Sequence, residues 1–306
     1  MIGAFFFALQ EQFRKMIGYY IVRAFVALLR WMTFRWIYRF SDVLYFFIYR
    51  VVGYRKSVVR QNIRKAFPDI DKREARKIER DFYHFFCDLF LETFKGISMT
   101  RKQLTRRYKV LHKEVMREFE REGTGAIICS GHLGNWEWGA TSLCTHTLRP
   151  MVGIFKPIKN QRLNDYFKET RSRFGIHLAA TTETGQAFKR FVGKKAYFML
   201  VGDQNPSNLE RAYWVDFFGS RLPALHGIEY YARRFDLPVI YFAIRPVRRG
   251  HYEIVPEILV RHPNELSEGE ITQIYMKRLE EEIRLYPGYF IWSHKRWKHE
   301  GKEPKN

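Results

Sequence analysis

Cysteine is scarce in this sequence. The three cysteines, Cys87, Cys129 and Cys144, are an odd number and stand at no spacing typical of metal ligands. This pattern argues against both a disulfide framework and a zinc site, and it favours a reducing compartment. The ten histidines include neither an H-E-x-x-H motif nor any pair at ligand spacing, so no metal is expected.

Long hydrophobic runs are also missing. The longest stretch without a charged residue covers residues 123–136, which is 14 residues, whereas a spanning helix needs about 20 mostly apolar residues. Unaided crossing of a membrane is therefore not expected. The N-terminal stretch MIGAFFFALQEQFRKM has no basic region ahead of its apolar residues and no A-x-A site, so a cleaved signal peptide is not expected either.

Acidic residues are heavily outnumbered. There are 53 Lys and Arg against 32 Asp and Glu, a net charge of +21, which predicts an anionic partner such as nucleic acid, anionic lipid, a phosphorylated ligand or an acidic carrier protein. The first 54 residues contain 17 aromatic residues, more than a solvated nucleic-acid-binding arm needs. Aromatic residues mixed with arginines favour a membrane surface over nucleic acid.

Residues 1–54 are accordingly interpreted as aromatic and basic helices that anchor the chain at a membrane interface. Arginines interrupt the apolar residues, and their long side chains can reach the headgroup region. At about 100° per residue, Arg23 and Arg30 share one helix face, whereas Arg35 and Arg39 lie well round from it. A kink, or burial against the rest of the protein, is needed to reconcile the two pairs.

Residues 55–306 are predicted to form one α/β catalytic domain with a central mixed sheet flanked by helices. Amphipathic helices are expected at 56–67 and 71–95, and RKQLTRRYK (101–109) is expected to be a basic loop or strand edge. From residue 123 apolar runs alternate with helical patterns. Strands are placed at 126–129, 151–155, 176–179, 196–201, 214–218, 238–246 and 252–256, and helices at 136–145, 160–174, 184–192, 225–235 and 267–286.

The segment AIICSGHLGNWEWGA (126–140) carries the candidate chemistry. An apolar strand leads through small residues to His132, and a helix follows from about Asn135. The carboxyl ends of strands are where α/β sheets place their sites. With His132 on the turn and Glu137 inside the helix, the carboxylate can hold one imidazole nitrogen while the other accepts a proton from a substrate hydroxyl.

If the activated hydroxyl attacks a carbonyl carbon, the site also needs groups that stabilise the resulting oxyanion. The candidates are Asn135, the backbone amides at the start of the helix, and a cation such as Lys156 or Arg171. Ser130 is interpreted as a small residue at a strand end rather than as a nucleophile. By itself, a His followed five residues later by a Glu is equally compatible with a capped helix beside a structural histidine.

The block GHLGNWEW (131–138) resembles the His-x4-Asp/Glu block of the lysophospholipid acyltransferase superfamily, in particular the bacterial secondary acyltransferases of lipid A biosynthesis. Further stretches are similar in the same order: VVRQNIRKAFP, DFYHFFCDLFLETFK, FKPIKN with Asn160, GDQNP, DFFG, GIEYYARRFDLPVI and IWSHKRWK. The resemblance implies that His132 is a general base with Glu137 as its partner. It also implies that Asp203 and Gln204 lie near the site.

The resemblance implies an enzyme on the cytoplasmic face of a bacterial inner membrane. It would take acyl chains from acyl carrier protein, or from acyl-CoA, as co-substrate without a cofactor, and esterify a lipid A precursor. SRLPALHG (220–227) departs from the family's usual wording, which leaves other lipid acceptors open. Also open are a hydrolase using the same His-Glu pair and a non-catalytic basic protein that binds membranes or nucleic acid.

Overall fold

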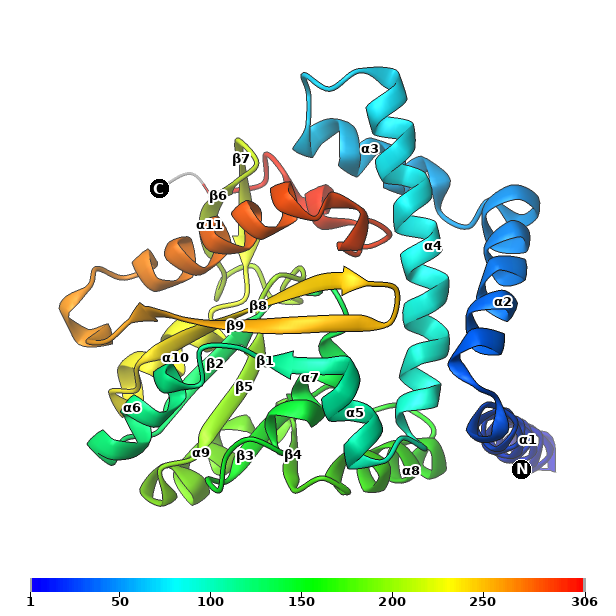
Figure 1. Cartoon of the computed structure of the whole chain (residues 1–306), viewed down its shortest axis with the longest axis horizontal. Coiled ribbons are helices and arrows are strands. Elements are labelled where there is room, and N and C mark those ends of the chain that lie inside the picture. The colour runs from blue at the N-terminus through cyan, green and yellow to red at the C-terminus, as the bar shows by residue number, and fades with distance from the viewer. Residues whose placement is uncertain (1, 305–306) are drawn as a thin grey trace.

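A seven-stranded sheet forms the centre of the computed structural model, which describes residues 2–304, with side chains from residue 16 onward (Figure 1). The strand order is β1-β9-β8-β2-β5-β3-β4. Only β8 and β9 pair antiparallel within it, so the sheet is mixed, as predicted. The strands are β1 (Tyr108–Val110), β2 (Ala126–Ser130), β3 (Met151–Phe155), β4 (Ile176–Ala180), β5 (Tyr197–Val201), β8 (Val239–Arg248) and β9 (His251–Val260).

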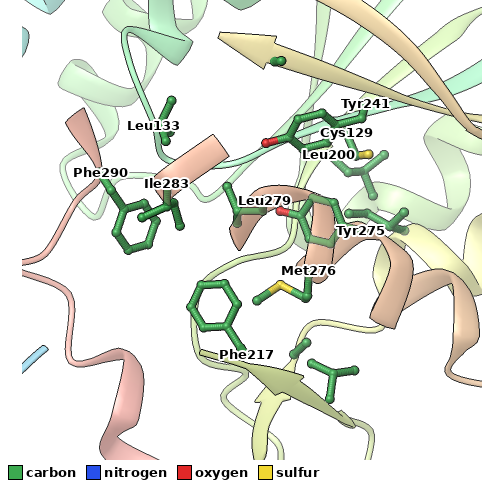
Figure 2. Packing of buried hydrophobic residues seen from close by; sticks show 14 of the residues in the cluster. Cys129, Leu133, Leu200, Phe217, Tyr241, Tyr275, Met276, Leu279, Ile283 and Phe290 are labelled. Carbon is green, nitrogen blue, oxygen red and sulfur yellow. The ribbon is translucent and has the colours of Figure 1, made fainter. Parts of the chain in front are cut away.

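Helices cover both faces of the sheet because its central strands alternate their apolar side chains between two cores. Ile127 and Cys129 of β2 belong to one core, and Ala126 and Ile128 to the other. The first core includes residues of α9 (Thr184–Phe191), α10 (Gly227–Phe235) and α11 (Glu270–Leu285). The second includes residues of α5 (Arg101–Arg107), α6 (Glu114–Glu122) and α7 (Trp136–Leu143). Figure 2 shows α11 side chains, among them Leu279, packing beneath Cys129.

Several helices precede the sheet along the chain. They are α1 (Ile2–Trp31), α2 (Phe34–Tyr45), a π-helix at Phe46–Val52, α3 (Lys56–Ala66) and α4 (Lys72–Gly96), the last capped by Asp71. Among the helices described, none is both long enough and apolar enough to cross a membrane. The chain thus combines a mixed α/β sheet with a layer of N-terminal helices.

The kink expected in the N-terminal segment lies between α1 and α2. Lys95 of α4 is buried, and its Nζ donates to the carbonyl oxygens of Leu29, Arg30 and Met32 at 2.8, 3.0 and 2.9 Å. These carbonyls at the end of α1 have no partner within the helix, so a cation is well suited to them. The local sequence pattern around Lys95 did not indicate this contact, because it joins residues more than 60 positions apart.

Two segments differ from the sequence-based expectation. RKQLTRRYK, expected as a loop or strand edge, forms helix α5 and then enters strand β1. Thr100 and Gln103 form a capping box that starts this helix. The two-stranded sheet of β6 (Tyr213–Phe217) and β7 (Ser220–Ala224) was expected only in its first strand. A proline inside β7 weakens its strand signature.

Candidate active site

His132 lies on the turn between β2 and α7, and the glycines beside it make the turn possible. A Cβ at Gly131 would come within 2.3 Å of Leu279, and Gly134 has a φ of +63° with Ile244 only 2.6 Å from the Cβ position. Both places therefore need glycine. The carbonyl of His132 also accepts a hydrogen bond from the backbone N–H of Ile291 at 3.2 Å.

Asp203 is the carboxylate that holds His132. Its Oδ1 lies 2.6 Å from the imidazole Nδ1, and its Oδ2 accepts the backbone N–H of His132 at 2.9 Å. Burial lowers the pKa of the imidazole, but the charge and hydrogen bond of Asp203 outweigh it, and with Glu137 they raise the pKa of His132 overall. Burial acts to raise the pKa of Asp203, but His132 and Arg296 bring it below its ordinary value. Asp203 thus fixes a basic imidazole.

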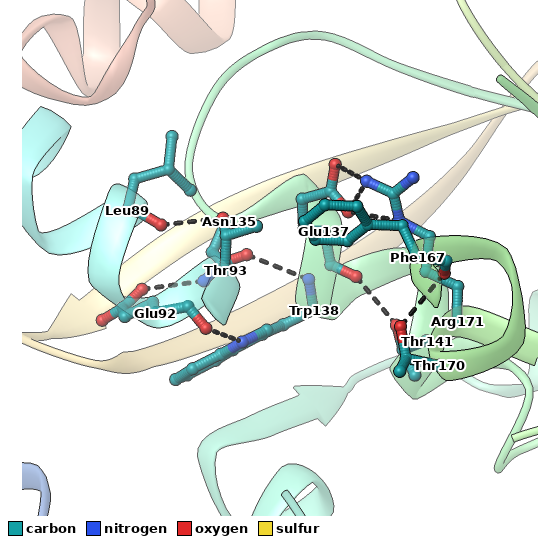
Figure 3. A network of polar contacts seen from close by, with 10 residues as sticks. All are labelled: Leu89, Glu92, Thr93, Asn135, Glu137, Trp138, Thr141, Phe167, Thr170 and Arg171. Carbon is teal, nitrogen blue, oxygen red and sulfur yellow. Dashed lines mark hydrogen bonds and ion pairs between the residues drawn. The ribbon is translucent and has the colours of Figure 1, made fainter. Parts of the chain in front are cut away.

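Glu137 does not make the imidazole contact that the sequence analysis assigned to it. Its carboxylate accepts hydrogen bonds from Arg171 instead, from Nε at 3.0 Å and from Nη2 at 2.8 Å (Figure 3). The expected His132–Glu137 pair is therefore wrong as a hydrogen bond, because Asp203 occupies Nδ1 and Arg171 occupies both oxygens of Glu137. Glu137 still contributes to the raised pKa of His132 and lines the same cavity.

Asn135 caps α7 and is not available to an oxyanion. Its side chain is fully buried, with Oδ1 accepting the N–H of Trp138 at 2.9 Å and Nδ2 donating to Glu92 at 2.7 Å (Figure 3). The expectation that Asn135 contacts substrate is therefore wrong, because both of its polar atoms are already engaged. A buried hydrogen-bond network of this kind fixes the turn that carries His132.

Glu92, on α4, is the centre of that network. Besides Asn135, it accepts hydrogen bonds from the hydroxyls of Tyr38 and Tyr252, at 2.7 and 2.9 Å. Burial raises the pKa of Glu92 to about 7, the three donors opposing the rise and the charge of Asp88 adding to it. The backbone carbonyl of Glu92 also accepts from the indole N–H of Trp138 at 2.9 Å. The N-terminal layer is thereby connected to the catalytic turn.

Residues near the C-terminus support the loop that carries Asp203. The backbone N–H of Asn205 donates to the ring of His294 at 3.2 Å, and Arg296 donates from Nη1 to Asn205 Oδ1 at 3.0 Å. Arg296 is almost completely buried, and burial lowers its pKa to about 10 although Asp203 acts in the opposite direction. The sequence signal for these residues was the closing IWSHKRWK segment, which entered only as part of the resemblance and was given no role.

A cavity of about 640 Å³ opens beside His132. Polar side chains line part of it, among them those of His132, Glu137, Lys156, Arg171 and Gln204. Apolar side chains from the sheet and from α7 line the rest, among them Ile128, Leu143, Ile176, Phe242 and Ile254. A cavity of this size with a few polar groups and an apolar interior suits a ligand with a hydrocarbon chain.

Of the remaining candidate residues, Gln204 and Lys156 lie at the cavity, and Asn160 does not. Gln204 lies beside His132, with its Nε2 3.3 Å from the imidazole Nε2, and exposed Lys156 lines the cavity. Asn160 instead lies at the N-terminus of α8 (Gln161–Ser172), where its side chain accepts the N–H of Leu163 at 3.3 Å. It is not among the residues that line the cavity. The hydroxyl of Ser130 donates to the carbonyl of Phe242 at 2.9 Å, consistent with a structural residue.

Comparison with known proteins agrees with this arrangement. No curated protein matches the chain. The family model described as bacterial lipid A biosynthesis acyltransferase matches residues 8–299, nearly the whole chain. The His132 turn, the Asp203 loop and the cavity all lie within the matched region. The chain therefore belongs to the bacterial lipid A biosynthesis acyltransferase family, whose members transfer an acyl group to a lipid acceptor.

Proposed function

We propose that the chain transfers a fatty acyl group from acyl carrier protein to a hydroxyl of a lipid A precursor, with His132 as the general base. The single observation that carries the proposal is an imidazole fixed by a buried carboxylate at a cavity with an apolar interior. Family membership supports the acyl transfer, and the acidic carrier protein and phosphorylated acceptor suit a net charge of +21.

The proposed reaction is a direct transfer. With Nδ1–H donated to Asp203, the Nε2 atom of His132 accepts the proton of the acceptor hydroxyl as its oxygen attacks the thioester carbonyl. The tetrahedral intermediate then collapses, the carbon–sulfur bond breaks, and the departing thiolate takes the proton from the imidazolium. No acyl-enzyme is required, because the attacking alcohol is the acceptor itself.

Arg171 and Lys156 are proposed to stabilise the oxyanion of that intermediate. Glu137 holds the guanidinium of Arg171 through Nε and Nη2, so the Nη1 group can face a developing negative charge. A cation already fixed before the reaction is worth more than a mobile one, because no reorganisation is needed. In this proposal Glu137 is a positioning residue for Arg171 rather than the partner of His132.

The proposed location is the cytoplasmic face of a bacterial inner membrane. Large apolar side chains of the N-terminal layer are exposed, among them Ile21, Leu28, Trp31, Trp36, Phe46, Phe47, Val51 and Val52. Arginines accompany them, including Arg30, Arg35, Arg39 and Arg50. This combination suits burial in the interfacial region of an anionic leaflet.

The test is acyl transfer by the purified protein from a labelled acyl thioester to a panel of acceptors. Acyl carrier protein and coenzyme A thioesters are compared as donors, and a lipid A precursor, a lysophospholipid and a glycolipid as acceptors. We expect the lipid A precursor to gain one acyl mass from the carrier-protein donor. His132→Ala should lose this transfer and keep vesicle binding, whereas His112→Ala, at an exposed histidine on the surface, should keep both.

Three results would contradict the proposal. Free fatty acid released equally fast without acceptor would indicate a hydrolase. Transfer to another lipid alone would indicate a different acceptor. Full activity in His132→Ala would remove the histidine from the mechanism.

A further inference from the structure

A second, smaller cavity of about 260 Å³ lies at the edge of the sheet, where α5 and β1 meet the turn between β8 and β9. Its lining includes Arg106, Arg107, Lys109, Arg248, His251 and Glu253. Three of these residues come from the RKQLTRRYK segment, whose basic character the proposed acyl transfer does not use.

The cations of this cavity are not neutralised by neighbouring carboxylates. In the described part of the chain, Arg106, Arg107, Lys109 and Arg248 form no ion pair, and Glu253 is the one carboxylate in the lining. Arg107 donates to the carbonyl of Gly250 at 3.1 Å.

The pKa directions of Arg107 and His251 agree with repulsion from the neighbouring arginines. Burial lowers the pKa of Arg107, and Arg248 and Arg106 lower it further, although Tyr38 and Glu92 oppose this. Burial also lowers the pKa of His251, and Arg107 and Arg248 add to that effect. An anion in the cavity would relieve this mutual repulsion.

The cavity adjoins helix α2, and the guanidinium carbon of Arg107 lies 3.3 Å from the centre of the Phe34 ring. Positions around the axis of α2 can be given as angles from Phe34, at about 100° per residue. On this scale Arg35 lies at about 100° and Arg39 at about 140°. The exposed side chains of Val43 and Trp36 lie on the opposite face, at about 180° and 200°. The two arginines therefore lie between the face against the cavity and the exposed apolar face of α2. Arg35 and Arg39 lie on α2 and Arg23 and Arg30 on α1, so the two pairs need not share one helix face.

The order of apolar face, arginines and basic cavity around α2 matches the order of acyl chains and headgroups at a membrane surface. If the apolar face of α2 enters the acyl region, Arg35 and Arg39 reach the level of the headgroups, and the cavity opens beside that level. Arginine side chains bind phosphate oxygens with paired N–H groups, and a lysine adds a point charge. A concave site of this volume suits a single headgroup rather than the helix of a carrier protein.

We propose that Arg106, Arg107, Lys109 and Arg248 bind the phosphate group of an anionic membrane lipid. The proposal rests on the proposed membrane location but not on acyl transfer. The site is distinct from the acyl-transfer cavity, because Arg248 lies four residues beyond Ile244, which packs on Gly134 of the His132 turn. Along an extended strand that separation is about 13 Å.

The experiment measures binding of the full chain to vesicles, by co-sedimentation. Vesicles contain phosphatidylcholine alone, phosphatidylcholine with phosphatidylglycerol, or phosphatidylcholine with cholesteryl hemisuccinate, an anionic lipid that carries no phosphate. The variant is Arg106→Gln with Arg248→Gln. The control is Arg117→Gln with Arg121→Gln, which removes the same charge from exposed positions on α6, at the far end of β9 (Figure 1).

We expect the Arg106/Arg248 variant to bind phosphatidylglycerol vesicles roughly 10- to 30-fold more weakly, because it loses two guanidinium groups that contact the phosphate oxygens. The control pair should change this affinity by less than about threefold, because α6 lies at the end of β9 away from the cavity, and salt screens charges that are far from the vesicle surface. Binding to hemisuccinate vesicles should fall by less than this, because only the general attraction between charges is lost there, and acyl transfer in detergent should persist. Acyl transfer failing in wild type and variant alike would refute the proposed function and not this site.

Five results would overturn the proposal. The two pairs could weaken binding equally, which would indicate only the overall charge. The variant could bind phosphatidylglycerol as well as wild type does. It could lose hemisuccinate binding equally, which would indicate a charge patch without phosphate recognition. It could lose binding to acyl carrier protein in the absence of lipid, which would indicate a site for that protein. Finally, the variant could lose binding of inorganic phosphate while its binding to vesicles stays the same, which would indicate a site for free phosphate.

Discussion

Asp203 contacts His132 twice, through the ring Nδ1 at 2.6 Å and through the backbone N–H at 2.9 Å. The second bond fixes the position of the turn, and the first fixes which ring nitrogen carries the proton. Because Asp203 is buried and its pKa stays low, it remains ionised in the neutral range. The proposed general base is thus oriented by a group 71 positions away in the sequence.

Asp203→Asn should lower kcat by about 10²- to 10⁴-fold with little effect on folding. The Asn oxygen can still accept the backbone N–H of His132, but an amide N–H facing Nδ1 would favour the wrong imidazole tautomer. Steady-state acyl transfer and the thermal midpoint Tm measure the two effects. Asp216→Asn, at an exposed carboxylate on β6, should leave both unchanged. Unchanged kcat in Asp203→Asn would exclude this role.

Lys95→Met should loosen α1 without unfolding the catalytic domain. The substitution leaves the carbonyls of Leu29, Arg30 and Met32 without their charged donor. Such losses cost about 1–3 kcal/mol, so amide hydrogen exchange at the end of α1 should become roughly 10- to 100-fold faster. The matched control is Lys72→Met, at an exposed position of the same helix. Equal exchange in both variants would contradict the capping role.

Because the carboxyl of Glu92 has a raised pKa, its deprotonation should lower the free energy of unfolding as pH rises toward neutrality. Its pKa is raised from 4.5 to about 7, so between these values the unfolded chain loses the proton first. The free energy of unfolding should therefore fall by about 3 kcal/mol between about pH 4.5 and 7 and change no further from this group above that range. Chemical denaturation measured across this pH range tests the slope.

Two substitutions separate the charge of Glu92 from its hydrogen bonds. Glu92→Gln keeps an acceptor of the same shape, so this contribution to the slope should disappear while the fold is retained. Glu92→Ala leaves the hydroxyls of Tyr38 and Tyr252 and the amide of Asn135 without their acceptor, which should cost about 3 kcal/mol or more. Parallel pH curves for wild type and Glu92→Gln would show that the carboxylate does not titrate in this range.

Ala140→Phe should shift the enzyme toward shorter acyl donors. Ala140 lines the cavity from α7, so a ring there takes space from a hydrocarbon chain. Each methylene that no longer fits forfeits about 0.8 kcal/mol, or about fourfold in kcat/KM. The measurement is kcat/KM over donors of increasing chain length, with Ala140→Ser as the volume-conserving control. An equal loss for all lengths would place the acyl chain elsewhere.

The sequence predicted the elements that carry local signals. Strand β2, the GHLG turn and helix α7 follow from an apolar run, glycines and a capping residue, and the expected β3 matches its observed bounds. The partner of His132 could not be predicted in this way, because it depends on strand order. Parallel pairing places Ser130 of β2 opposite Val201 of β5. His132 and Asp203 each follow two residues later, so they meet across the sheet edge.

Glu137 was assigned to His132 because a turn followed by a helix could bring the two together and because the segment resembles the His-x4-Asp/Glu block. The fold brings Arg171 of α8 to Glu137 instead, a contact between residues 34 apart. The roles of Glu92 and Lys95 could not be predicted either. Both lie on helix α4, and their positions fit an ordinary amphipathic pattern. Long-range pairing of buried charges therefore limited the prediction of the site.

The pH dependence of kcat/KM for acyl transfer, in wild type and in Asp203→Asn, tests the central claim most directly. A general base must be neutral, so activity should rise with pH through the pKa of His132, which lies above its ordinary value of 6.5. Removing the charge of Asp203 should move this acidic limb to lower pH while lowering the plateau. An acidic limb that stays at the same pH in both proteins would contradict the account.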